Sequence, residues 1–170
     1  VNHPEETNMK LNSLKLFDGF LFSDLKYLMA YSIPLTAIFG FYMGGYWLLT
    51  TPIYIFLIIP IIEHLLTFLK IDDLEKGRIN KSTHWIFDLM LYINIPLVYG
   101  ILIYALIFLK NNDIFSVEYI IGILAVGLVV VSNGINVAHE LCHRSKKYEK
   151  FLGKFLLIPS LYMHFYLEHN

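Results

Sequence analysis

The sequence predicts an all-α, integral-membrane helical bundle with four transmembrane helices and a short re-entrant or interfacial helix. Three observations predict this fold class. Apolar residues make up 56% of the 170-residue chain and charged residues only 16%, no charged residue occurs from position 27 to position 62, and two more long apolar stretches follow at 85–109 and 119–138. A soluble domain of this size needs more polar surface than this chain has.

Charge balance and cysteine content exclude two other classes of protein. The chain has 13 basic and 14 acidic residues, which gives no reason to expect binding to nucleic acid, since that calls for a basic face or stripe. Its single cysteine, Cys142, excludes an intrachain disulfide and therefore a disulfide-stapled scaffold.

The first part of the chain predicts a surface segment and two spans. Residues 1–26 place lysines among leucine and phenylalanine side chains, which suits a helix lying at a membrane surface. The uncharged stretch 27–62 is too long for one crossing, because a helix rises about 1.5 Å per residue and the hydrocarbon core is about 30 Å thick. The expected break lies between Gly44-Gly45 and Pro52. The first span therefore begins at about residue 27, and the second span ends at about residue 69.

Two further spans follow a charged loop at 70–81. Residues 85–109 are the predicted third span, in which a transmembrane helix tolerates Pro96, and residues 119–138 are the fourth. Basic residues gather in the 70–81 loop and after the fourth span, so the positive-inside rule places both in the cytoplasm, together with the two termini. Residues 151–163 are apolar but too short to cross, so we expect the chain to return to the side that it left.

The end of the fourth span carries two histidines, His139 and His143. Residues four apart lie on one face of a helix, so their imidazoles suit a single metal ion. The re-entrant segment is expected to bring His164 and His169 back to the same membrane face. A lone histidine near the end of a span, such as His64, more often makes a structural hydrogen bond.

The spacing alone does not select the metal. His139, Glu140 and His143 match the zinc-protease signature, in which the glutamate acts as general base. Two features weigh against a zinc protease: the motif emerges from a long membrane span, and a second histidine group follows at His164 and His169. Imidazole suits iron as well as zinc, and a site rich in neutral histidines with open positions is a reasonable place for oxygen chemistry.

Three stretches carry a family resemblance. Residues 136–144, Asn-Val-Ala-His-Glu-Leu-Cys-His-Arg, resemble the first histidine box of the membrane-bound alkane 1-monooxygenases. Residues 164–170, His-Phe-Tyr-Leu-Glu-His-Asn, resemble the start of their second box, and residues 59–63 are similar to part of the second span. The resemblance places the chain in the wider group of integral-membrane fatty acid desaturases and hydroxylases.

The resemblance implies a site of two non-haem iron ions that activates O2 and hydroxylates the terminal methyl group of medium-chain alkanes, with electrons from a rubredoxin. It implies that the ligands, and through the metal the catalytic residues, are His139, His143 and His169, with His164 as a further candidate. Residues expected to accept an imidazole N–H or to orient a ligand are Glu140, Glu168, Asn136 and Asn170. Cys142 and Arg144 stand where the family commonly has glycine and lysine.

The same resemblance implies a location and a division of the chain. It predicts a multi-pass protein of a bacterial inner membrane, with its site facing the cytoplasm and alkane arriving from the lipid. Residues 27–170 would be an incomplete transmembrane hydroxylase domain, the N-terminal fragment of a six-span protein. Bulky side chains of the second span, Tyr54 and Phe56, are expected to limit how deep an alkane enters.

Two alternatives stay open at this point. One is a fatty acid desaturase or a xylene-type hydroxylase with the same histidine-ligated centre. The other is a non-enzymatic or zinc-binding membrane protein.

Overall fold

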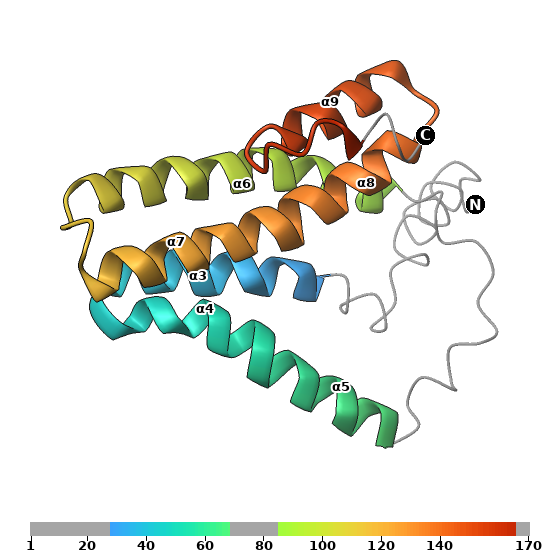
Figure 1. Cartoon of the computed structure of the whole chain (residues 1–170). Coiled ribbons are helices and arrows are strands. Elements are labelled where there is room, and N and C mark those ends of the chain that lie inside the picture. Colours follow the sequence, from blue (N-terminus) through green and yellow to red (C-terminus); the bar gives the residue numbers. More distant parts are fainter. Residues whose placement is uncertain (1–27, 69–84, 166–170) are drawn as a thin grey trace, which may run out of the picture.

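The computed structural model of the protein describes residues 28–68 and 85–165, and every regular element in these ranges is a helix (Figure 1). The all-α prediction is confirmed for this part of the chain. The predicted surface segment 1–26 and the charged loop 70–81 lie outside the described residues, as do residues 166–170.

The predicted break between the first two spans occurs at Gly44 and Gly45. Their φ angles are 67° and 57°, in a region that residues with a Cβ rarely adopt. A Cβ on Gly40 would lie 2.9 Å from the carbonyl oxygen of Trp47, so the two arms of the turn pack closely. The elements before the turn are η2 (Met29–Tyr31) and α3 (Ser32–Met43); those after it are η3 (Gly45–Leu49), α4 (Thr50–Ile53), the π-helix η4 (Tyr54–Ile58) and α5 (Ile59–Phe68).

Two long helices complete the bundle. One is α6 (Trp85–Lys110); the other is a continuous run of α7 (Val117–Val129), the π-helix η6 (Val130–Ile135) and α8 (Asn136–His143). Three stretches are long and apolar enough to cross a membrane: Gly45–Phe68, Phe87–Lys110 and Val117–His143. The first predicted span forms the shorter apolar helix Met29–Met43, so a count of four crossings stays a prediction.

The last helix, α9 (Lys147–Leu157), folds back along α8. The Cβ positions show the direction, because Gly153 meets Cys142 and Ala138 whereas the later residue Leu156 meets Gly134. After α9 the chain turns again, and the backbone N–H of Tyr162 donates to the Leu157 carbonyl oxygen at 3.3 Å. This path agrees with the expected re-entrant segment, except that the helix begins at residue 147, before the apolar stretch.

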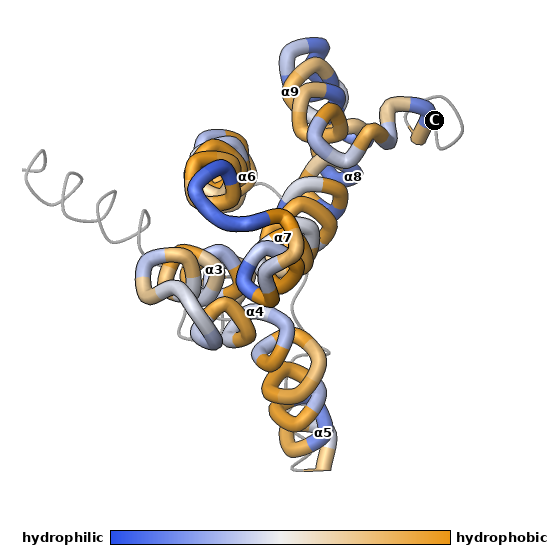
Figure 2. The backbone as a smooth tube through the Cα atoms, turned by 60° about the vertical axis from the view of Figure 1, so that its left-hand side comes forward, coloured by the Kyte–Doolittle hydropathy of each residue, from blue (hydrophilic) through white to orange (hydrophobic). Residues whose placement is uncertain are grey.

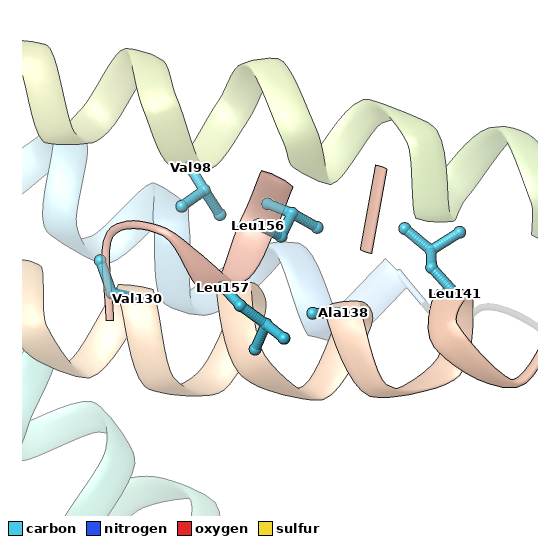
Figure 3. Close-up of a cluster of buried hydrophobic side chains, with 6 residues drawn as sticks. All are labelled: Val98, Val130, Ala138, Leu141, Leu156 and Leu157. Carbon is cyan, nitrogen blue, oxygen red and sulfur yellow. The ribbon is translucent and has the colours of Figure 1, made fainter. Parts of the chain in front are cut away.

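The buried core near the chain's end joins α6, η6, α8 and α9. Figure 3 shows its six side chains: Val98, Val130, Ala138, Leu141, Leu156 and Leu157. Hydrophilic residues gather at the turn between α6 and α7 and at the start of α9, while the helices between are mainly hydrophobic (Figure 2). By contrast, α5 diverges from the other helices and buries no residue among those described (Figure 1).

Candidate metal centre

The two histidines of α8 lie side by side. One helical turn separates them, and the centroids of the His139 and His143 rings are 4.7 Å apart, with the ring planes tilted by 60°. His139 is half-buried and His143 is exposed. The pair therefore presents two imidazoles on one accessible edge of the helix, at the end of the stretch Val117–His143.

The chain that follows α9 returns to this pair. The Phe165 ring packs edge-on against His139, with centroids 5.5 Å apart, and Tyr162 lies 5.4 Å from Phe165. His164 is exposed and stacks edge-on against Tyr162 at 4.5 Å. Phe165 directly follows His164, so the chain reaches His139 within the second histidine group, four residues before His169.

The donor set fits a metal, and the described residues supply part of it. Two imidazoles at helical spacing suit iron and zinc equally well. Within residues 28–68 and 85–165, no group of three or more His, Cys, Asp or Glu side chains is placed to hold an ion. The predicted site residues His169, Glu168 and Asn170 lie outside the described residues, so the ligand set stays a prediction.

Charged residues join the end of α8 to α6. The Arg144 guanidinium pairs with Asp88 of α6, Nη1 to Oδ1, at 3.1 Å and with Glu140, Nε to Oε1, at 3.3 Å. Arg144 and Asp88 are only 24% and 30% exposed, so water screens this pair less than it would a fully solvated pair. Glu140 thus lies beside a cation, and Asn136, the first residue of α8, is exposed.

A buried amide network joins η6, the element before the histidine helix α8, to α6, and the sequence patterns did not predict it. Asn133 of η6 donates from Nδ2 to the Asn94 side-chain oxygen on α6 and to the Ala30 carbonyl oxygen, each at 2.9 Å. Ser132 donates to the Asn133 side-chain oxygen at 3.1 Å, and both asparagines are 3% exposed. Polar residues within apolar spans are costly unless they are hydrogen-bonded, so the two amides were the available signal.

A second polar contact holds α9 against α6. Glu149 is 3% exposed and accepts a hydrogen bond from the Tyr92 hydroxyl at 2.6 Å. Tyr148 lies 3.2 Å from the same hydroxyl. A hydrogen bond from Lys146 to the Tyr148 hydroxyl, 3.3 Å long, raises the pKa of Lys146. These contacts fix the start of the helix that leads to Phe165.

The residues predicted to line an alkane path lie on η4. The Tyr54 hydroxyl donates to Ser32 Oγ at 2.8 Å, and the Phe56 side chain is 66% exposed. His64, farther along on α5, is exposed. The path itself stays a prediction.

Comparison with known proteins finds relatives of similar sequence. The chain is 28% identical over 102 residues to alkane 1-monooxygenase 1 of Alcanivorax borkumensis, which covers 59% of the chain and 23% of the relative. The chain is similar to alkane 1-monooxygenases. It is 29% identical over 140 residues to alkane 1-monooxygenase 2 of the same organism, covering 81% of the chain and 37% of the relative. It is also 29% identical over 101 residues to the alkane 1-monooxygenase of Ectopseudomonas oleovorans, covering 59% and 23%.

The chain thus spans between 23% and 37% of the length of these relatives. No family model and no solved structure matches it.

Proposed function

We propose that the protein acts as a membrane monooxygenase that hydroxylates the terminal methyl group of medium-chain alkanes, using O2 and electrons from a rubredoxin. The His139–His143 pair carries this proposal, because two imidazoles share one edge at the end of a helix long enough to cross a membrane. The similarity to alkane 1-monooxygenases supports the reaction class.

The proposed cofactor is a pair of non-haem iron ions. His139 and His143 would hold it together with His169, and His164 is a further candidate. Bound iron would supply the activation of O2 needed to break a strong terminal C–H bond, which acid–base side chains do not supply. Neutral imidazole is a common ligand for iron as well as for zinc, so the described donors fit this assignment.

The protein's own residues would position the ligands and keep the site dry. Phe165 covers part of the His139 ring, and Arg144 ties the last turn of α8 to Asp88 of α6. An alkane gains about 0.8 kcal/mol for each CH2 group that it buries in the bilayer, so it would reach the site from the apolar side. We propose that Tyr54 and Phe56 limit the length of chain admitted.

We also propose that the site faces the cytoplasm from a bacterial inner membrane. A soluble electron donor would then meet a membrane-dissolved substrate at the end of α8. The basic residues that follow α8, including Arg144, Lys146 and Lys147, support this orientation through the positive-inside rule.

One experiment tests the reaction and the metal together. The full-length protein is expressed in membranes with a rubredoxin and its reductase, and is given octane and ¹⁸O2. We expect 1-octanol that contains ¹⁸O, and two irons per chain in the purified protein. His139→Ala and His143→Ala should each abolish product and lower bound iron, whereas the exposed His64→Ala on α5 is the matched control and should change neither.

Other outcomes would identify the alternatives. An alkene in place of the alcohol would overturn the hydroxylase in favour of a desaturase. One zinc per chain, with no iron and no product, would overturn both in favour of a zinc-binding membrane protein.

A further inference from the structure

The buried face of the last long helix changes at the π-helix η6. In α7 the buried residues follow intervals of three and four: Gly122, Ala125 and Val129. Continued at these intervals, an α-helix would bury Asn136, Glu140 and His143, but all three are exposed. The residues buried in α8 are instead Ala138, two positions after Asn136, and Leu141 and Cys142, one and two positions after Glu140.

The π-helix explains this change of face. A π turn holds one more residue than an α turn between its bonded backbone groups. Each residue after it therefore takes the position on the helix face that the preceding residue would have in an uninterrupted α-helix. One residue of an α-helix corresponds to about 100° of rotation. Because η6 spans Val130–Ile135, immediately before α8, it turns Ala138 inward and His143 outward. α9 then packs on the face that carries Ala138 and Cys142.

Buried amides hold η6 in place. Its Asn133 bonds to α6 through Asn94 and to the start of the first helix through the Ala30 carbonyl oxygen. Asn94 in turn donates to the Met90 carbonyl oxygen at 2.9 Å, so the amides of both asparagines are hydrogen-bonded. The network fixes η6 against two neighbouring helices at the point where the helix face changes.

We infer that the one extra residue in η6 sets the rotation that presents the histidine pair, and that Asn133 is a positioning residue for this site. An uninterrupted α-helix would carry His143 on the face that packs against the bundle. The inference rests on the proposed function only for the identity of the ion that the imidazoles bind; the rotation itself stands on burial and hydrogen bonding.

Two single-residue deletions in the same helix separate this inference from a general effect of shortening. Val131 of η6 and Leu124 of α7 are both exposed apolar side chains, 55% and 46% exposed. Deleting Val131 should convert η6 to α-helix and leave α8 in its present rotation. Deleting Leu124 should keep η6 and turn α8 by about 100°, moving Ala138, Leu141 and Cys142 off their packing partners.

The readouts are iron(II) bound per chain and the thermal midpoint of the full-length protein in detergent. We expect the Val131 deletion to retain most of the bound iron, with a midpoint close to that of the wild type. The Leu124 deletion should lose the iron, and its midpoint should fall by about 10 °C or more, because three buried side chains lose their contacts. Equal loss or equal retention in the two variants would overturn the inference.

The midpoints also separate this inference from the proposed function. If the wild-type protein binds no iron, the proposed function fails, and the difference between the two midpoints still tests the rotation.

Discussion

α8 and α9 pack closely at Gly153, and enlarging this residue tests whether that contact supports the site. A Cβ at this position would lie 2.8 Å from Cys142 Sγ, 2.9 Å from the Ala138 carbonyl oxygen and 3.2 Å from the Cys142 backbone nitrogen. Two of these neighbours are backbone atoms of α8. Gly153→Ala therefore forces the two helices apart rather than moving one flexible side chain.

The size of the effect follows from two opposing terms. Overpacking a close contact costs about 1–3 kcal/mol, and the backbone neighbours place this contact near the upper end. Alanine regains about 1 kcal/mol over glycine in helix propensity. The net loss is about 2 kcal/mol, which for a chain of this size lowers the thermal midpoint by about 4–8 °C.

The assay is thermal unfolding in detergent, with Gly127→Ala as matched control. Nothing lies within 4 Å of a Cβ at Gly127, so that variant should gain propensity alone and melt about 2–4 °C higher. Adding Cys142→Ala to Gly153→Ala should recover part of the loss, since the Sγ contact is removed. If Gly153→Ala raises the midpoint as Gly127→Ala does, the close packing of α9 on α8 does not hold.

Three further perturbations test other contacts by the same thermal assay. Asn133→Leu leaves the Asn94 side-chain oxygen without its donor and should lower the free energy of unfolding by about 1–3 kcal/mol. Replacing both asparagines should cost less than the sum of the two single losses, and strict additivity would contradict a shared network. Leu161 has a φ of 54°, so Leu161→Gly should relieve about 1 kcal/mol of strain and raise the midpoint, and a lower midpoint would refute this. Arg144→Met removes the cation beside Asp88 and should lower the midpoint modestly, by less in 1 M salt than in dilute buffer; a loss independent of salt would exclude an ionic cause.

The long apolar helices and their main break were predictable because both depend on local composition. Apolar length alone marks a span, and the two glycines at 44 and 45 supply the positive φ that the turn requires. The spacing of His139 and His143 also places them together, since residues four apart meet on any α-helix. These features need no knowledge of tertiary contacts.

The features that depend on packing between helices were not predictable in the same way. A π turn leaves no strong signal in the sequence, so the face exposed by α8 could not be derived from the pattern of α7. Asn94 and Asn133 are 39 residues apart, and neither reveals its partner by spacing. The start of α9 was also expected too late in the chain. Lys147 and Glu149 are polar, so the segment was expected to begin at residue 151, whereas the helix begins at Lys147 and Glu149 is buried against Tyr92.

The position of Cys142 gives the protein a built-in chemical reporter. It is the only thiol in the sequence, it is 2% exposed, and a Cβ on Gly153 of α9 would lie 2.8 Å from its sulfur. A small maleimide can therefore alkylate the chain only when α9 lifts from α8, and the alkylation rate measures the free energy of that local opening. Each tenfold change in rate would correspond to about 1.4 kcal/mol, without any engineered label.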